Sequence, residues 1–358
     1  MTVINVSDKF QLFPDDLKTF DKLPKGTYVV RFNKMEGFSL MKRDDLKVDE
    51  KMYGNHKNKA LKALKTFDAF DRSLGVILSG DKGIGKTMFT RFMAEQMVEE
   101  KGLPVILVDQ PYHGIADFIS SIKQEAMVLF DEFEKVFDND NDNIERQDSL
   151  LGLFDGLSST KHMYVITVND LYRLSKFMQN RTGRFHYHFR FEYPTGDEVR
   201  EYVHDNSENI DKETVEKIVD FSAKVKVTFD TLRSIVFEIS QGYSFSETVE
   251  DLNISRGENT SYAVTAIDEH GKEHVMRGQQ ELDLFSSEIV ARGTVLSLGG
   301  YYDIRMTNKN IESLPMGAFA LTDIEPVEIY GEDGEESELK LERVILTPVA
   351  GKNIKYTV

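Results

Sequence analysis

The residues best suited to chemistry are 80–87, which read Gly-Asp-Lys-Gly-Ile-Gly-Lys-Thr and fit the pattern G-x-x-x-x-G-K-[ST] at every fixed position. A glycine-rich turn between a strand and a helix points backbone N–H groups and the positive end of the helix at phosphate. Both neighbours are present, because residues 76–78 form an apolar run and residues 87–97 have a helical pattern. We therefore expect a phosphate-binding loop rather than a chance glycine turn.

Individual roles within this loop follow from side-chain chemistry. Lys86 should reach the β- and γ-phosphates of ATP, and the hydroxyl of Thr87 should hold Mg²⁺. Further nucleotide contacts are predicted for the rest of the loop and the next helical residue: Gly80, Asp81, Lys82, Gly83, Ile84, Gly85, Lys86, Thr87 and Met88.

A second group of reactive side chains ends the apolar run at residues 127–130, where Asp131 and Glu132 follow directly. A buried strand would bring Asp131 beside the nucleotide, where it can hold Mg²⁺ directly or through water. Glu132 could then polarise the water that attacks the γ-phosphate. The alternative is a plain strand followed by an acidic helix start, and the phosphate loop upstream favours the catalytic interpretation.

Three later residues add to this set. Asn169 ends the next apolar run, and Arg181 and Arg184 lie in the segment Arg-Thr-Gly-Arg-Phe. Asn169 resembles sensor 1, and the arginine segment resembles the R-x-G-R-F motif, of the AAA subfamily of AAA+ ATPases. Residues 150–157 are similar to the leucine-rich helix ending in Asp-Gly that precedes sensor 1 in AAA proteins. The resemblance covers roughly residues 60–245. It implies that Asn169 lies near the attacking water.

The resemblance also implies that both arginines act as fingers toward the γ-phosphate held by a neighbouring subunit. Phosphoryl transfer spreads charge over three oxygens, so an arginine supplied in trans neutralises that charge only when two subunits are docked. A solvated basic turn is the alternative for Arg181 and Arg184.

Two further residues carry alternatives. Tyr112, in Tyr-His-Gly, is similar to the aromatic pore loop of AAA unfoldases, which grips an extended polypeptide, or it packs on its own loop. Arg233 resembles sensor 2, a nucleotide-contacting arginine of clamp loaders and initiators that the AAA subfamily often lacks. A surface salt bridge explains Arg233 nearly as well.

The chain as a whole predicts an α/β fold with a P-loop parallel sheet and three additions. We expect an N-terminal β-rich unit over 1–55, the AAA+ ATPase domain over 56–193, a helical lid over 194–249 and an all-β domain over 250–358. The strands predicted for the parallel sheet are 76–79, 104–108, 127–130, 164–168 and about 187–191. A capping box at Thr195 and Glu198 should start the lid.

Composition limits the setting. The 358 residues contain no cysteine, which excludes disulfides and thiolate metal sites and suits a reducing compartment. The N-terminus resembles no signal peptide, and no apolar stretch approaches the ~20 residues of a membrane span. We expect a cytoplasmic protein, in the host cytoplasm if it is phage-encoded, as the compact core suggests. The core is also loosely similar to the Bcs1-like AAA proteins without their membrane helix.

Charge helps to rank the functions. The net charge is −17, and residues 251–358 hold 10 Lys and Arg against 19 Asp and Glu. Such charge disfavours nucleic acid, although a local basic patch could still bind it. The leading hypothesis is a homo-oligomeric ring, a hexamer, that remodels or threads a protein bound through the pore loop and the β domain. The alternatives are a clamp- or helicase-loading ATPase of DNA replication or recombination, and a nucleotide-gated scaffold.

Overall fold

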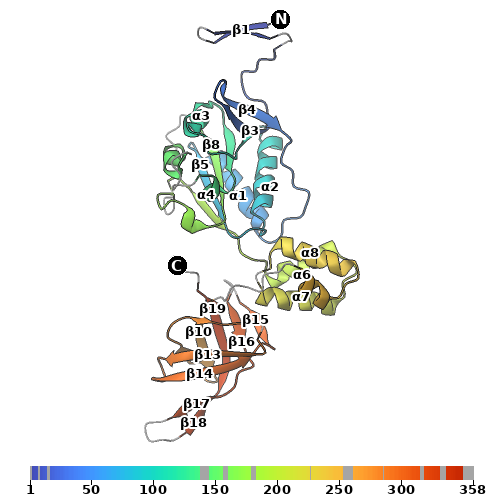
Figure 1. Cartoon of the computed structure of the whole chain (residues 1–358), viewed down its shortest axis with the longest axis vertical. Coiled ribbons are helices and arrows are strands. Elements are labelled where there is room, and N and C mark those ends of the chain that lie inside the picture. Colours follow the sequence, from blue (N-terminus) through green and yellow to red (C-terminus); the bar gives the residue numbers. More distant parts are fainter. Residues whose placement is uncertain are drawn as a thin grey trace. The chain divides into compact units, whose positions relative to one another are not determined.

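The computed structural model describes residues 2–6, 9–13, 17–137, 145–155, 160–178, 183–225, 227–252, 261–284, 286–314, 318–330 and 336–349. The contacts within the chain define two compact units, Met1–Glu192 and Tyr193–Val358. Each unit is described separately, and Figure 1 labels their elements.

The first unit alternates strands with helices after residue 56. Its strands are β1 Thr2–Val6, β2 Lys9–Phe13, β3 Gly26–Asn33, β4 Gly37–Arg43, β5 Leu74–Ser79, β6 Pro104–Val108, β7 Ala126–Phe130, β8 His162–Val168 and β9 Tyr187–Arg190. Its helices are α1 His56–Ala69, α2 Lys86–Glu99, α3 Ile115–Ser121, α4 Phe133–Val136 and α5 Leu151–Phe154, with 3-10 turns η1 Gln147–Leu150 and η2 Leu171–Arg173. All five strands predicted for the parallel sheet are confirmed, as β5 to β9.

Seven strands form one sheet in the order β4-β3-β6-β7-β8-β5-β9, and only the pair β3–β4 is antiparallel. The glycine-rich loop follows β5. The ends of β8 and β7 come next along the same edge, because the carboxyl ends of parallel strands share one edge of a sheet. This order brings three loops that are distant in sequence to one place.

Strand β3 belongs to the ATPase sheet, although it lies before residue 56, where the ATPase domain was predicted to begin. It pairs in parallel with β6, with Thr27 opposite Val105 and Val29 opposite Leu107, so β3 and β4 extend the ATPase sheet. The reason is burial, because residues 26–30 are all buried. A strand covered on both faces belongs inside a sheet rather than in a separate half-exposed hairpin. The β1–β2 hairpin forms a two-stranded sheet of its own.

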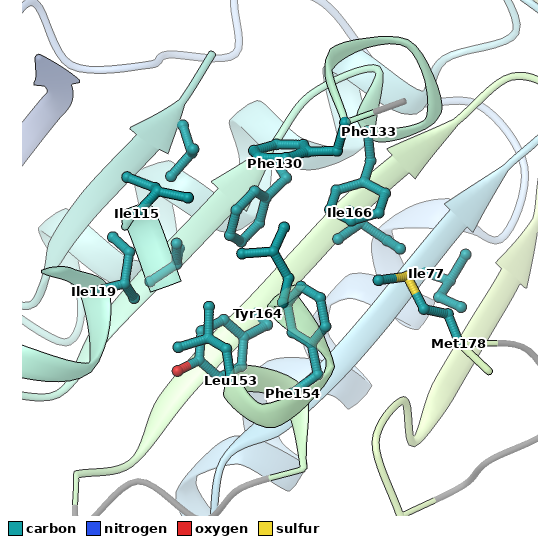
Figure 2. Packing of buried hydrophobic residues seen from close by; sticks show 14 of the residues in the cluster. Ile77, Ile115, Ile119, Phe130, Phe133, Leu153, Phe154, Tyr164, Ile166 and Met178 are labelled. Carbon is teal, nitrogen blue, oxygen red and sulfur yellow. The ribbon is translucent and has the colours of Figure 1, made fainter. Parts of the chain in front are cut away.

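Helices α1 and α2 cover one face of the sheet, and α3 and α4 cover the other (Figure 1). On the α4 side, Phe130, Phe133 and Phe154 pack edge to face with ring centroids 5.7–6.1 Å apart, as Figure 2 shows. These rings bury large apolar areas directly beneath the ends of β7 and β8. The sheet edge that carries the reactive residues therefore rests on a close-packed base.

The second unit begins with helices and continues with strands. Its helices are α6 Gly196–Asn206, α7 Lys212–Lys224, α8 Phe229–Ser240 and α9 Phe245–Asp251. Its strands are β10 Ser261–Asp268, β11 Glu273–Val275, β12 Gln280–Glu281, β13 Glu288–Val295, β14 Gly300–Thr307, β15 Ile311–Ser313, β16 Phe319–Leu321, β17 Val327–Tyr330, β18 Glu336–Leu339 and β19 Leu341–Pro348. Thr195 and Glu198 form the predicted capping box of α6.

The strands of the second unit pair only antiparallel within the described residues, which confirms the predicted all-β region. Its described buried residues are mostly apolar, and a buried histidine and aspartate lie among the strands. His274 is 2% exposed and lies between Ser297 Oγ (2.7 Å from Nδ1) and Asp268 Oδ2 (3.0 Å from Nε2). The His274 bond and backbone N–H donors lower the pKa of Asp268 to about 2. This network joins the turn after β10 to the turn after β13.

Candidate nucleotide site

The backbone of the loop at 80–87 depends on glycine. Gly80, Gly83 and Gly85 have φ values of +141°, +76° and +101°, a range that side chains rarely adopt. A Cβ on Gly80 would also lie 2.5 Å from both Ile84 Cδ1 and the carbonyl oxygen of Phe191. Helix α2 begins immediately after Gly85, so the loop presents the positive end of that helix as the phosphate-binding pattern predicts.

Lys86 is folded into this loop. Its side chain is 7% exposed, and Nζ donates to the carbonyl oxygens of Gly80 (2.5 Å) and Asp81 (2.6 Å). Burial lowers the pKa of Lys86, against the opposing effect of Asp81 and then of Glu134, Asp131 and Glu132. The ammonium is thus placed at the start of α2, beside the backbone that would surround a phosphate.

The expected magnesium ligands are oxygen donors. Thr87 is the second residue of α2 and Asp131 follows β7, and both are exposed. A hydroxyl and a carboxylate are the donor types that Mg²⁺ prefers, and they leave the remaining positions to water and phosphate. The residues therefore fit the ion, whose chemistry would be to offset phosphate charge. Within the described ranges, no three His, Asp or Glu side chains form a metal cluster of their own.

Glu132 occupies a strained position at the end of β7. With φ of +47°, it is the only non-glycine residue with positive φ in the part of the chain that the structure describes. Its Oε1 accepts from Lys135 Nζ at 2.8 Å and lies 3.4 Å from Lys82 Nζ. The hydrogen bond from Lys135 holds the pKa of Glu132 below its usual value. The carboxylate stays ionised and can accept a hydrogen bond from water.

Asn169 meets Glu132 across the neighbouring strand ends. Its Nδ2 donates to Glu132 Oε1 at 3.1 Å, and the two residues follow the adjacent strands β7 and β8. The structure thus brings together the carboxylate and the amide that the sequence analysis assigned to the attacking water. Two strands separated by more than thirty residues supply the pair.

Arg184 is hydrogen-bonded to residues before it in the chain. Its side chain is 8% exposed, Nη2 donates to Asp155 Oδ2 at 2.8 Å, Nε donates to Asp155 Oδ1, and Nη1 donates to the carbonyl oxygen of Phe177 at 2.6 Å. The guanidinium is thus engaged within its own chain, and its action as a finger in trans stays a prediction. Arg181 lies outside the described residues.

Tyr112 packs against its own domain. Its half-buried ring lies 5.9 Å from Phe32 and 6.2 Å from Phe38, both on the β3–β4 hairpin. Gly114, two residues later, begins α3 with a φ of +81°. The aromatic-x-Gly segment therefore forms a packed turn before α3, as in the second interpretation of this tyrosine.

Arg233 lies on α8 and is exposed, in the second unit of the chain. Its predicted contact with nucleotide stays a prediction.

Sequence reasoning missed two residues beside Glu132. Thr167 and Glu134 are 2% and 1% exposed and hydrogen-bond to the ends of β7 and β8. A signal was present, since Thr167 and Asn169 are two apart and Glu132 and Glu134 are two apart. Polar residues at that spacing, where strands end beside a phosphate loop, are candidates for the same site.

Comparison with known proteins agrees with this geometry. Residues 76–193 match the model of the ATPase family associated with various cellular activities (AAA). No curated protein matches the chain at a significant level. Among solved structures, a RuvB mutant of Thermotoga maritima matches with a TM-score of 0.43 and 17% identity, covering 56% of this chain and 70% of that one.

Two further structures match to a similar extent. A chain of the HORMA:CdnC:Trip13 complex from E. coli MS115-1 gives a TM-score of 0.41 and 15% identity over 54% of this chain and 79% of that one. The RuvB Holliday junction branch migration motor of T. maritima gives 0.41 and 18% over 56% and 70%. None of these matches concerns the Bcs1-like group or a phage origin, which stay predictions.

The family match begins within β5 and ends just after β9, so it spans the phosphate loop, the carboxylate pair after β7 and Asn169. Residues 76–193 form an AAA ATPase domain, and the protein that carries it is an ATP-hydrolysing enzyme.

Proposed function

We propose that this ATPase works as a homo-oligomeric ring that uses ATP hydrolysis to remodel or thread a protein partner. The observation that carries the proposal is the meeting of Glu132 and Asn169 at 3.1 Å beside the phosphate loop. A protein that only bound nucleotide as a scaffold would have no need of a strained carboxylate paired with an amide at that point.

The residues of the site take the following proposed roles. Lys86 exchanges its carbonyl partners for the β- and γ-phosphates, and Thr87 and Asp131 hold Mg²⁺. Glu132 polarises the attacking water, while Asn169 orients it. Arg181 reaches the γ-phosphate of a neighbouring subunit. Arg184 ties the segment before β9 to the end of α5 through Asp155. Turnover then depends on assembly, because one protomer lacks the trans arginine.

A protein partner is supported by charge. The described ATPase site is cationic at Lys86 and Lys82, whereas the C-terminal 251–358 segment holds 19 acidic against 10 basic residues. Acidic surfaces repel phosphate backbones, so the β domain suits a basic or neutral protein better than nucleic acid. Among the described residues, no helix is both long and apolar enough to cross a membrane.

The first test replaces Glu132 with Gln. Hydrolysis should fall at least ~100-fold, the usual scale for loss of a general base, while ATP binding and ATP-dependent assembly persist. Steady-state phosphate release and the sedimentation of the ATP-bound protein measure the two properties. Glu125→Gln is the matched control, since Glu125 is exposed and its carboxylate lies 3.4 Å from Lys161 Nζ. Parental hydrolysis by Glu132→Gln would refute the catalytic assignment.

A second candidate, a DNA-directed ATPase, is favoured only by the exposed Arg233 on a lid helix. It predicts that duplex or single-stranded DNA stimulates hydrolysis, with a steep loss of stimulation between 50 and 200 mM salt, on the order of 10³-fold. The remodelling proposal predicts no such stimulation. It predicts instead that protein captured by ATP-bound Glu132→Gln is unfolded by the parent in an ATP-dependent manner.

A further inference from the structure

The ends of β7 and β8 are joined by a continuous chain of hydrogen bonds. Thr167 Oγ1 donates to Asp131 Oδ1 at 2.6 Å and accepts from the backbone N–H of Glu132 at 2.8 Å. Asn169 Nδ2 then donates to Glu132 Oε1 at 3.1 Å, and the backbone N–H of Asn169 donates to Glu134 Oε1 at 3.0 Å. This series of hydrogen bonds joins the three residues with proposed catalytic or metal-binding roles to Thr167 and Glu134.

The Thr167 hydroxyl supports the strained residue. Glu132 has a φ of +47°, a conformation that costs on the order of 1–3 kcal/mol and persists only when its surroundings hold it. Thr167 is 2% exposed and accepts the N–H of Glu132, so this amide depends on the hydroxyl rather than on bulk water. The same hydroxyl fixes Asp131. One buried oxygen therefore holds the carboxylate of Asp131 and the backbone of Glu132.

Glu134 supports the other side of the pair. It is 1% exposed, a degree of burial that carboxylates rarely show, and Oε1 accepts the backbone N–H of Asn169. Its Oε2 has no hydrogen-bond partner among the described residues. A buried carboxylate with one unsatisfied oxygen is costly, and such a group in a native structure calls for a functional reason. The contact that it does make fixes Asn169.

We propose that Thr167 and Glu134 are positioning residues for ATP hydrolysis. Thr167 fixes the backbone of Glu132 and Glu134 fixes the backbone of Asn169, so that the two side chains meet where the attacking water is polarised. The inference rests on the roles proposed above for Glu132 and Asn169. Neither Thr167 nor Glu134 needs to touch the nucleotide, and each acts through the residue that it holds.

The test uses two matched pairs of substitutions in the full chain. Thr167→Val keeps the shape and removes the hydroxyl, whereas Thr167→Ser keeps the hydroxyl. Glu134→Leu removes the acceptor, whereas Glu134→Gln keeps Oε1. We expect kcat to fall at least ~10-fold in Thr167→Val and Glu134→Leu, because a displacement near 1 Å can cost ~100-fold. We expect KM and the affinity for a fluorescent ATP analogue to stay within about twofold, and Thr167→Ser and Glu134→Gln to keep most of the parental kcat.

A double-mutant cycle separates positioning from a general loss of fold. If Thr167 acts through Glu132, Thr167→Val should lower the rate of Glu132→Gln by a smaller factor than it lowers the parental rate. Parental kcat in both Thr167→Val and Glu134→Leu would overturn the inference. An equal loss of kcat in Thr167→Val and Thr167→Ser would also overturn it, as would additive losses of kcat in the double-mutant cycle. Parental hydrolysis by Glu132→Gln alone would instead refute the proposed catalytic roles, which keeps the two failures distinct.

Discussion

At the scale of single residues, Arg184 is held by hydrogen bonds within its own chain. Arg184 stands in the same Arg-Thr-Gly-Arg-Phe segment as Arg181, yet its guanidinium makes three hydrogen bonds inside its own chain, to Asp155 and Phe177. A planar guanidinium with two donors on one carboxylate is a rigid anchor. Arg184 therefore ties α5 to the segment before β9, and its loss should be felt as lost stability.

We expect Arg184→Met to lower the free energy of unfolding by about 2 kcal/mol, because it removes the charge-assisted hydrogen bonds that the guanidinium makes to Asp155. The figure is below the range for fully buried pairs, since the Asp155 side chain is 32% exposed. Thermal unfolding of Arg184→Met, Asp155→Leu and the double variant measures the coupling. A finger in trans would show the opposite pattern, with unchanged stability and reduced kcat only in assembled protein.

At the scale of elements, strand β5, which precedes the phosphate loop, packs closely against a segment that is distant in sequence. Gly75 lies inside β5, and a Cβ there would lie 2.2 Å from the carbonyl oxygen of Arg184 and 2.8 Å from Phe185 Cδ1. The neighbouring amide of His186 donates to the Gly75 carbonyl at 2.9 Å. The segment that carries Arg184 thus passes directly against β5.

Gly75→Ala should lower the free energy of unfolding by about 1–3 kcal/mol, the usual cost of overpacking, because the nearest atom is a backbone carbonyl oxygen that cannot move aside as a flexible side chain could. Gly152→Ala is the control. Gly152 lies in α5 with open space around its Cα, so alanine there should be neutral or stabilise by about 0.5–1 kcal/mol. Chemical denaturation of both variants gives the comparison, and equal effects would contradict the packing argument.

The limits of sequence reasoning also appear at this scale. The strands around the loop, Glu132 and Asn169 were predictable, because apolar runs and the polar residues that end them are local signals. The parallel pairing of β3 with β6 and the bond between Arg184 and Asp155 were not. Both join segments that are distant in sequence. Hydrophobic periodicity is a local signal, so it does not indicate which strand a buried strand pairs with or which carboxylate an arginine binds.

At the scale of the whole molecule, two buried histidines should make the stability of the ATPase unit depend on pH. His162 begins β8 and is 0% exposed, and burial lowers its pKa to about 4. His188 on β9 has its pKa lowered to about 4 by burial and then by Arg190. Between the usual value near 6.5 and 4, the unfolded chain binds protons that the folded chain does not. Stability should therefore fall as pH falls through that window.

For His162 alone, the loss between pH 7 and pH 5 should be roughly 2 kcal/mol. Hydrogen exchange of the β8 amides, corrected for the intrinsic effect of pH, measures it. His162→Phe should reduce the difference between the two pH values by about that amount. If the variant and the parent lose the same stability, another group is responsible.

The place of β5 in the sheet has a consequence for biosynthesis. Both of its neighbours, β8 and β9, follow it in the chain, so one edge stays unpaired until residue 168 has been made and the other until residues near 190 have been made. At ~5–20 residues per second, that interval lasts about 5–20 seconds on the ribosome. During that interval the nascent chain contains the complete phosphate loop but not both of the strands that flank β5. Capture of ATP should therefore begin only when translation has passed β9.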